Sequence, residues 1–441
     1  MLSRREFTGR LAAGAAGLAI ASTARSYAQI LGANDRVNFA VIGVHGRGNA
    51  HLAALKHNEK SARVTCACDV ESNFLAKFLG SAQKSLGYAP RGEKDIRKVL
   101  ASKDVDAITI ATPDHWHAPM AILGVEAGKH VYVEKPCSFD PNEGALVVAA
   151  QKKYGKLMQV GSQQRSSPHT IKIIGDIHNG LIGRAYLAEA WYENRRGSIG
   201  IGKEAPVPAT LDWDLFQGPA PRRPYHDNYQ PYNWHWFRAW GTGETLNNGS
   251  HEVDLCRWAL GVEYPKSVEA QGARYAYKDD WQFYDTLNVA WKYDDAMITW
   301  DGRSCNPMPR YGRDRGVLIV GTKGSVIVDR DGYEVYSFDG RKVDEFTANR
   351  VKTSSTDAIG ADSMTDLHFA NLIAGIQRGE KLTAPIEVGV VGCTMLQLSN
   401  YAWETQRNLK LDPANQARIV GDPKALAMTR REYDKEWEPK V

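Results

Sequence analysis

The chain has 441 residues, a length at which a single hydrophobic core usually gives way to two domains. Its content of 43% hydrophobic and 24% charged residues is ordinary for a soluble globular protein. The net charge of +4 is small for this length and leaves no basic footprint, so we expect no nucleic-acid partner.

The first residues have the features of a targeting segment. Ser3-Arg4-Arg5-Glu6-Phe7 is a twin-arginine signature, followed by an apolar stretch from Leu11 to Thr23 and a small-residue cleavage site at Ser26-Tyr27-Ala28. The apolar stretch is too short and too rich in Ala and Gly to be a stable membrane anchor. We therefore expect residues 1–29 to be a signal peptide for the twin-arginine export machinery, which delivers the protein to the periplasm. The alternative is a chance Arg-Arg pair in a frayed N-terminus.

From Arg36 onward, strand and helix patterns alternate with short turns between them. This alternation predicts a parallel, doubly wound α/β sheet, that is, a Rossmann domain over residues 34–160. The expected strands are 37–44, 63–69, 106–111, 131–133 and 157–161, and the expected helices are 49–56, 71–86, 118–127 and 142–154.

After Gln163 the pattern changes to one of long strands that turn on Gly and Asp. We expect a C-terminal α+β domain over residues 161–408, built on a large, open, mainly antiparallel sheet, and a peripheral tail over 409–441. The Gly/Pro/aromatic stretch 195–243 is long enough to be a functional surface. The expected strands are 185–191, 268–275, 286–291, 297–303, 317–321, 325–329 and 333–338, and the expected helices are 170–179, 253–260, 366–378 and 388–404.

A glycine-rich turn, Gly43-Val44-His45-Gly46-Arg47-Gly48, follows the first strand and opens a helix. Such a turn points backbone N–H groups at a pyrophosphate, so Gly43, His45, Gly46, Arg47 and Gly48 are candidate cofactor-binding residues. Asp69 ends the second strand, where a carboxylate binds the ribose hydroxyls and repels a 2′-phosphate. The pattern therefore predicts NAD as the cofactor. The alternatives are that the glycines form an ordinary βα turn and that Asp69 caps a helix.

Two further segments leave the carboxyl ends of strands at the same sheet edge. Thr112 and Pro113 are candidates to wall the nicotinamide, and His117 is expected to begin a helix behind them. Glu134-Lys135-Pro136 ends a buried apolar strand, because proline cannot continue the ladder. A lysine in such a cleft is a compact proton donor. The alternative is a solvated ion pair at a strand end.

A histidine lies at the start of an expected helix in the second half of the chain. Asn247-Asn248-Gly249-Ser250-His251-Glu252-Val253-Asp254 places His251 in the first helical turn and Asp254 on the same face. An imidazole titrates near neutral pH, which suits proton transfer to a carbinol. A capping histidine is the alternative. The six cysteines show no zinc or redox spacing, and we expect no metal.

With these residues assembled, the chain resembles the Gfo/Idh/MocA oxidoreductase family from about Val37 to Glu404. In that family the lysine of a Glu-Lys-Pro motif contacts substrate and nicotinamide. The histidine of an Asp-x-x-x-His element exchanges the proton of the substrate hydroxyl. The resemblance thus implies catalytic roles for Lys135 and His251, with Asn247 where an aspartate is expected. His45 in the glycine turn is a second departure.

The resemblance also implies substrate-facing residues and an oligomer. Gln163, Gln164 and Arg165 stand where family members contact substrate, and Asp254 matches the acid that follows the histidine. The candidates for a sugar-binding wall are Trp234, His235, Trp236, Arg238 and Trp240, for which loop packing is the alternative. Relatives pair their open sheets face to face, which implies a homo-oligomer.

The predicted function is that of an NAD-dependent oxidoreductase acting on a CH–OH group of a sugar, polyol or glycoside. Export away from the cytoplasmic NAD pool implies a tightly bound cofactor that is regenerated within the site. One alternative is an NAD-dependent glycosidase that oxidises C3 transiently and then eliminates the aglycone. Another is a nucleotide-binding protein without turnover, for which Asn247 is the argument.

Overall fold

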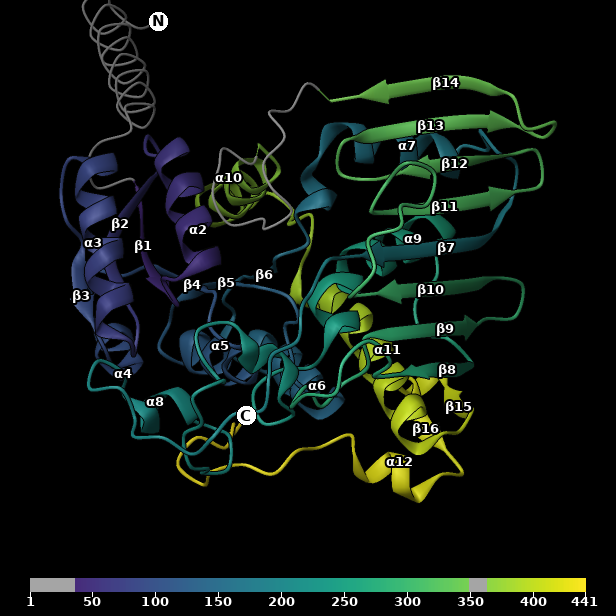
Figure 1. Cartoon of the computed structure of the whole chain (residues 1–441). Helices are drawn as coiled ribbons and strands as arrows, with labels where there is room; N and C mark the ends of the chain where they lie inside the picture. Colours follow the sequence, from purple (N-terminus) through teal and green to yellow (C-terminus); the bar gives the residue numbers. More distant parts are fainter. Residues whose placement is uncertain (1–35, 349–362) are drawn as a thin grey trace, which may run out of the picture.

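The computed structural model of the chain describes residues 36–348 and 363–441, and the predicted signal peptide lies outside them. Two sheets lie side by side, each with helices packed against it (Figure 1). Within the described ranges, no helix is both long and apolar enough to span a bilayer.

The N-terminal sheet confirms the predicted doubly wound fold. Its six parallel strands run in the order β3-β2-β1-β4-β5-β6. The central strands form because short apolar runs are buried on both faces. The strands are β1 (Val37–Ile42), β2 (Ala62–Cys68), β3 (Arg91–Glu93), β4 (Ala107–Ile110), β5 (His130–Val133) and β6 (Met158–Val160). The main helices are α2 (Gly46–His57), α3 (Ser72–Leu86), α4 (Ile96–Leu100), α5 (His117–Glu126) and α6 (Pro141–Tyr154).

The C-terminal sheet is large and mainly antiparallel, as predicted, and among its described strands only β7 and β10 pair in parallel. Its order is β14-β13-β12-β11-β7-β10-β9-β8-β15-β16. The first strands along the chain are β7 (Ala185–Glu193), β8 (Ser267–Ala273), β9 (Thr286–Lys292), β10 (Met297–Arg303) and β11 (Arg315–Gly321). The others are β12 (Gly324–Val328), β13 (Gly332–Ser337), β14 (Lys342–Thr347), β15 (Leu409–Asp412) and β16 (Arg418–Val420).

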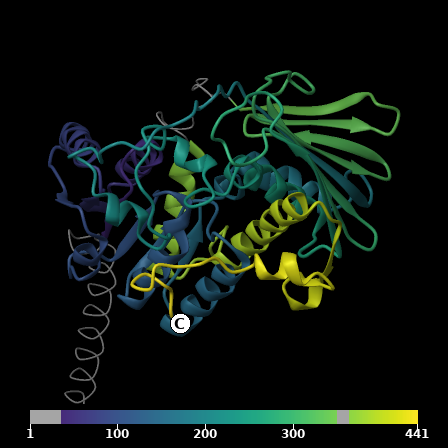
Figure 2. The ribbon, with the colours of Figure 1, turned by 60° about the horizontal axis from the view of Figure 1, so that its bottom comes forward.

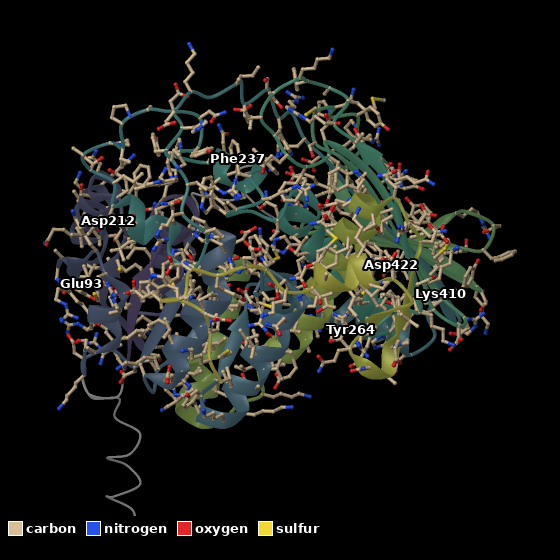
Figure 3. The ribbon with its side chains drawn as sticks, turned by 90° about the horizontal axis from the view of Figure 1, so that it is seen from below. Glu93, Asp212, Phe237, Tyr264, Lys410 and Asp422 are labelled. Atoms are coloured by element: carbon tan, nitrogen blue, oxygen red, sulfur yellow. The ribbon has the colours of Figure 1, made fainter. Side chains whose placement is uncertain are left out.

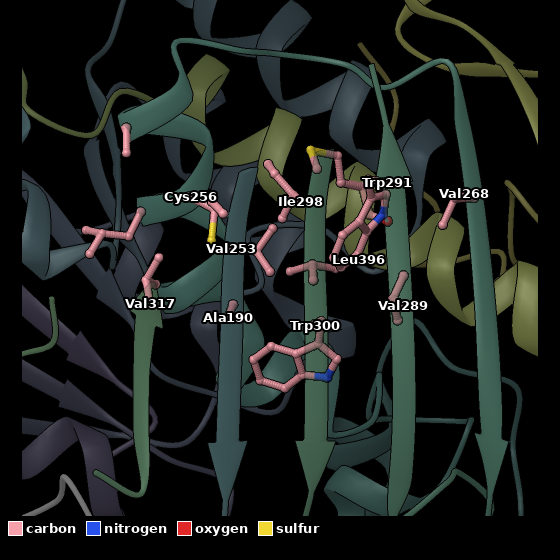
Figure 4. Packing of buried hydrophobic residues seen from close by; sticks show 14 of the residues in the cluster. Ala190, Val253, Cys256, Val268, Val289, Trp291, Ile298, Trp300, Val317 and Leu396 are labelled. Carbon is pink, nitrogen blue, oxygen red and sulfur yellow. Dashed lines mark hydrogen bonds between the residues drawn. The ribbon is translucent and has the colours of Figure 1, made fainter. Parts of the chain in front are cut away.

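One face of this sheet is buried under helices α9 (Ser250–Leu260) and α11 (Ile386–Thr405). Alternate residues of β10 point into that core, and Ile298 and Trp300 lie against the helices (Figure 4). Helix α7 (Pro168–His178) covers the part of the face nearest β13. A continuous apolar core therefore fixes the position of α9, and with it the position of His251.

Helix α10 (Ser363–Arg378) packs on the N-terminal domain, which corrects the prediction that it closes the second domain. Phe369 stacks on Tyr132 of β5 with ring centroids 4.4 Å apart, and Leu372 joins the core under β1. The prediction assigned α10 to the second domain because of its place in the sequence. The apolar face of an amphipathic helix, however, does not indicate which sheet the helix covers.

The predicted peripheral tail is also corrected. Strands β15 and β16 extend the C-terminal sheet through β8, and α12 (Pro423–Ala427) follows them. The last segment then runs to the helices of the N-terminal domain (Figure 2). There Trp437 packs edge-on against Trp116 with ring centroids 4.8 Å apart. The C-terminal segment therefore ties the two domains together.

The Gly/Pro/aromatic stretch 195–243 contains one short helix, α8 (Trp213–Gln217), and a 3-10 turn, Asn233–Trp236. Part of it, residues 208–220, leaves the C-terminal domain and lies against the N-terminal one; we call it the strap. Asp212 of the strap lies on the same side of the molecule as Glu93 of β3 (Figure 3). Its backbone N–H donates to Val70 O at 2.9 Å, and Ser72 N–H donates to Thr210 O at 2.9 Å.

Candidate active site

A cavity of about 440 Å³ lies between the two domains. The carboxyl ends of β1, β2, β4 and β5 open into it, as expected for an open α/β sheet. The start of α9 and the stretch after β7 form the opposite wall. Residues from both domains therefore meet in one space.

The glycine turn lines this cavity at the start of α2. Gly43 has φ +78°, and a Cβ there would lie 2.5 Å from Ala111 O, so only glycine fits. A Cβ on Gly48 would lie 2.2 Å from Gly43 O. His45 has φ −74°, an ordinary value, and its ring stacks on Phe74 with centroids 4.2 Å apart. The central position of the turn therefore needs no glycine, which accounts for that departure.

Asp69 lies at the end of β2 and lines the same part of the cavity. Its carboxylate accepts hydrogen bonds from Val44 N–H at 2.8 Å and Glu71 N–H at 2.9 Å. Burial raises the pKa of Asp69 to about 6 despite these bonds. A carboxylate placed here and ionised at neutral pH can accept hydroxyl donors from a ribose.

Glu134 is held by a set of buried donors. Its Oε1 accepts from Arg47 Nε at 2.7 Å, His51 Nε2 at 3.1 Å and Gln163 Nε2 at 3.1 Å. Burial alone would raise the pKa of Glu134, but Arg47 and His51 hold it well below its usual range. The side chain of Arg47 thus contacts Glu134 and also Thr365, and the glycine turn to which Arg47 belongs lines the cavity.

Lys135 joins the two domains at the cavity. Its Nζ donates to the backbone O of Asn247 at 2.5 Å and to the side-chain Oδ1 of Asn247 at 3.2 Å. Asn247 belongs to a π-helical turn, Thr245–Gly249, that leads directly into α9. Lys135 and Asn247, which come from different domains, are thus in direct contact.

His251 lies one turn further along and also lines the cavity. Its imidazole makes no hydrogen bond to another residue of the described ranges. Burial, assisted by the charges of Arg330 and Lys135, holds the pKa of His251 well below its ordinary value. The ring is therefore neutral near pH 7 and able to accept a proton.

Several buried polar atoms of the cavity wall have no hydrogen-bond partner among the residues that the structure describes. They include Thr112 Oγ1 and Gln164 Oε1. Pro113 lies beside Thr112, and His117 begins α5 behind it. His117 Nδ1 contacts the carbonyl oxygen of Pro136 at 2.7 Å, and its Nε2 contacts that of Thr112 at 2.9 Å. Unpaired buried polar atoms are costly, so this wall suits a polar ligand such as the NAD carboxamide.

Several residues predicted to contact substrate are engaged elsewhere and do not line the cavity. Arg165 binds Asp254 bidentately at 2.6 and 2.9 Å beneath α9. Trp236 is 1% exposed and stacks on Trp281, and Arg238 pairs with Glu404. These interactions fill the core and the domain surface, so for Trp236 and Arg238 the loop-packing alternative fits the structure.

Gln164, Trp234 and His235, which the sequence suggested as substrate-facing, line the cavity. The residues of the cavity wall that escaped the prediction are Asn194, Arg195, Arg196, Gln230, Tyr232, Asn248 and Arg330. Arg195 and Arg196 follow the end of β7 much as Lys135 follows β5, and that position could have marked them. The remaining residues lie on long loops, whose path carries no periodic signal.

The strap closes the side of the cavity near Asp69. Leu211, Leu215 and Phe216 line it there. Phe216 O contacts His115 Nε2 at 2.8 Å and accepts from Trp116 Nε1 at 3.1 Å. The C-terminal domain therefore covers part of the N-terminal domain's cofactor side.

Comparison with known proteins agrees with this architecture. Residues 37–162 match the oxidoreductase family with an NAD-binding Rossmann fold, Gfo/Idh/MocA, and residues 177–327 match the C-terminal domain of the same family. Together the two matches cover more than half of the chain.

Individual relatives carry several activities. The chain is 24% identical to the inositol 2-dehydrogenase of Rubrobacter xylanophilus over 67% of this chain and 72% of that protein. It is 28% identical to a glycosyl hydrolase family 109 protein of Shewanella baltica over 36% of this chain and 35% of that protein.

Among solved structures, the WlbA dehydrogenase of Bordetella pertussis, in complex with NADH and UDP-GlcNAcA, has a TM-score of 0.62 at 22% identity, over 86% of this chain and 99% of that one. The likeness in fold, the two matched sequence segments and the cavity between the domains all indicate the same family. The chain belongs to the Gfo/Idh/MocA oxidoreductase family, and its N-terminal domain is the NAD-binding Rossmann domain of that family.

Proposed function

We propose that this NAD-dependent oxidoreductase acts on a secondary CH–OH group of a sugar, polyol or glycoside. The observation that carries the proposal is the meeting of Lys135 from one domain and His251 from the other in the cavity that the glycine turn opens into. The inositol 2-dehydrogenase relative and the sugar-nucleotide complex of WlbA support a carbohydrate substrate.

The proposed roles follow from protonation and contacts. His251 is neutral and unpaired among the described residues, so it accepts the hydroxyl proton. Lys135, whose Nζ is aligned by Asn247, donates a hydrogen bond to the reacting oxygen. Bound NAD supplies the hydride acceptor. Gly43, Gly46 and Asp69 would hold the dinucleotide.

We also propose that the cofactor stays bound between turnovers. The strap is tied to the N-terminal domain by backbone hydrogen bonds at Val70 and Ser72, and its side chains Leu211 and Phe216 cover the cavity beside Asp69. Release of a dinucleotide through this side would require those contacts to break. A retained cofactor favours chemistry that restores NAD within the site.

A redox-neutral glycosidase is the second candidate function. Its support is the glycosyl hydrolase family 109 relative, together with the closed cofactor side of the cavity. In this reaction, oxidation at C3 would acidify C2–H, and elimination would expel the aglycone and leave a C1–C2 double bond conjugated to the C3 ketone. Water would then add at C1, and reduction of the C3 ketone would return the hydride to the sugar.

One experiment separates these functions. The protein is purified folded, its nucleotide is released by acid and quantified, and absorbance at 340 nm is followed against a panel of sugars, polyols and glycosides. Net NADH supports the dehydrogenase. Free sugar from a glycoside without net NADH supports the glycosidase. Absence of any nucleotide, both bound and after incubation with NAD, would refute both.

We further propose that residues 1–29 direct export by the twin-arginine route to the periplasm, and that the protein forms a homo-oligomer. The support for export is the Arg4-Arg5 signature and the cleavage site that follows it. Fractionation of cells that produce the natural chain or an R4K/R5K variant tests export. Light scattering of the purified protein tests the oligomer.

A further inference from the structure

A buried carboxylate stands one turn before Asn247, at Glu244. This residue is 2% exposed and begins the π-helical turn that leads to α9. Its Oε1 accepts from the side-chain Nδ2 of Asn247 at 3.4 Å and from that of Asn248. Arg196 donates to both carboxylate oxygens, to Oε1 at 3.2 Å. Glu244 is therefore ion-paired on one side and bound to two amides on the other.

These contacts fix which way the Asn247 amide faces. A lysine ammonium can only donate, and an ionised carboxylate can only accept. The Nδ2 of Asn247 must therefore point at Glu244, and its Oδ1 must point at Lys135, where it accepts at 3.2 Å. An amide can make both contacts at once, whereas an ionised carboxylate at residue 247 could not donate to Glu244. The result is a continuous chain from Arg196 through Glu244 and Asn247 to Lys135.

The same geometry explains why residue 247 is not an aspartate. An aspartate there would lie about as close to Glu244 as Asn247 does, at 3.4 Å. Two carboxylates at such a separation cannot both ionise readily. A site with a carboxylate at 244 therefore favours a neutral residue at 247.

Other titratable groups lie close enough to Lys135 to interact with its charge, and two of them are bound by residues other than Lys135. The groups that couple to it electrostatically are Asp114, Glu134, His235 and His251. Asp114 accepts from the hydroxyl of Thr242 at 2.6 Å, and Glu134 is bound by Arg47 and His51. Glu244 differs from both because it reaches Lys135 through a residue that the lysine itself contacts.

We propose that Glu244 is the positioning residue for Lys135, and that Glu244 and Asn247 together replace the single aspartate of the Asp-x-x-x-His arrangement. This inference rests on the proposed function for the catalytic role of Lys135. Its geometric content, the control of the lysine by Glu244, can be tested without a substrate.

The first test measures the Lys135 amine directly. The full-length protein saturated with NAD is treated with trace acetic anhydride at a series of pH values, and acetylation of Lys135 is quantified by peptide mass spectrometry. In E244Q the charge of Arg196 is no longer balanced, so the midpoint of Lys135 labelling falls by about one pH unit. In E244Q/N247D the carboxylate is moved next to the lysine, and the midpoint returns to that of the natural protein.

A matched control removes a different buried Glu–Arg pair. Glu143 is fully buried and binds Arg431 at 2.5 Å, away from the cavity. E143Q is expected to lower stability but to leave the Lys135 midpoint unchanged. A midpoint in E244Q equal to that of E143Q, or a double variant no different from E244Q, would overturn the proposal.

The second test uses turnover with the sugar that gives the fastest 340 nm signal. We expect E244Q to lower kcat by roughly ten- to a hundredfold, with the content of bound NAD unchanged, because the lysine loses its alignment. N247D alone is expected to be impaired as well, and the double variant to recover at least about tenfold over E244Q. Equal losses in kcat for E244Q and the double variant would contradict the proposal. If no sugar is turned over by the natural protein, the proposed function fails, and the acetylation series still decides the role of Glu244.

Discussion

Lys135 and His251 come from different domains, and their protonation states decide what the pair can do. Burial comes first in lowering the pKa of His251, and the nearby charges of Arg330 and Lys135 lower it further. A neutral imidazole facing an ammonium gives one proton acceptor and one proton donor in the same cavity. Oxidation of a carbinol requires this combination.

The pH dependence of turnover follows from His251. A base must be unprotonated to act, and a lowered pKa keeps it unprotonated at more acidic pH. We therefore expect the acidic limb of kcat/KM for alcohol oxidation to lie below pH 6.5, the ordinary histidine value. A pH–rate profile in the oxidative direction measures it. A limb at or above 6.5 would remove His251 from the role of base.

Asp69 gives a second pH-dependent property. Its pKa is raised to about 6, so the carboxylate is ionised above that pH and progressively protonated below it. Because the ionised form is the better acceptor for ribose hydroxyls, NAD affinity should weaken as pH falls through about 6. We expect D69N to bind NAD roughly ten- to a hundredfold more weakly at pH 8 and to lack this pH dependence. Titration calorimetry at several pH values checks both, and an unchanged Kd in D69N would count against the assignment.

Residue-scale prediction from the sequence worked where the partners are local. Gly43 and Asp69 belong to one strand–turn–helix–strand unit, and both line the cavity as their spacing indicates. Their role in binding the cofactor stays a prediction. Residue-scale prediction failed for Arg165 and Trp236, whose partners Asp254 and Trp281 lie far away in the chain. A single sequence does not show which distant residue a polar or aromatic side chain will meet.

At the scale of elements, the C-terminal core supports the catalytic turn. Trp300 of β10 is 2% exposed, and a Cβ on Gly249 would lie 3.1 Å from its ring. Gly249 ends the π-helical turn that carries Asn247 and leads to His251. The sheet core and the site therefore share one tightly packed contact.

Loss of this contact should be costly. Trp300→Ala removes a buried indole and leaves a cavity, so we expect a loss of about 3–5 kcal/mol in the free energy of unfolding. Phe338→Ala is the control, because Phe338 is 82% exposed and its loss should change stability by less than about 0.5 kcal/mol. Denaturant unfolding followed by circular dichroism compares the two. Similar values for both variants would contradict this description of the core.

Elements with a strong apolar pattern were found from the sequence, and those without one were missed. Strand β10 alternates buried and half-buried residues and was predicted correctly. Strand β14 has six exposed residues, and β3 is an exposed Arg-Gly-Glu edge. Both pair with a neighbouring strand that gives them their form, and such pairing is not visible in their own residues.

At the scale of the whole molecule, three segments cross between the domains and hold the cavity together. They are the strap, helix α10 and the C-terminal segment after α12. Helix α11 joins them, since Cys393 packs with the N-terminal core and Leu396 with the C-terminal core. The two domains are therefore held together by several segments and are not a simple pair on a flexible linker.

The strap predicts how long the cofactor stays bound. Protein purified by gel filtration in NAD-free buffer should retain NAD, and L211A/F216A should release it roughly ten- to a hundredfold faster because two covering side chains are lost. Phe237→Ala is a matched control, since Phe237 and Phe216 are both 5% exposed and share one aromatic cluster, but only Phe216 lines the cavity. Release is timed by mixing with alcohol dehydrogenase and ethanol. Equal rates in all three proteins would refute the role of the strap.

The most direct test of the central claim is a single-turnover measurement of absorbance at 340 nm. Holoprotein is mixed rapidly with the substrate found in the panel, using the natural chain, K135A and H251A. The structure predicts one equivalent of bound NADH in the natural chain, or a transient rise if the reaction is redox-neutral, and rates at least about a hundredfold lower in both variants, each of which still binds NAD. A K135A protein that reduces its NAD at the natural rate would contradict the account.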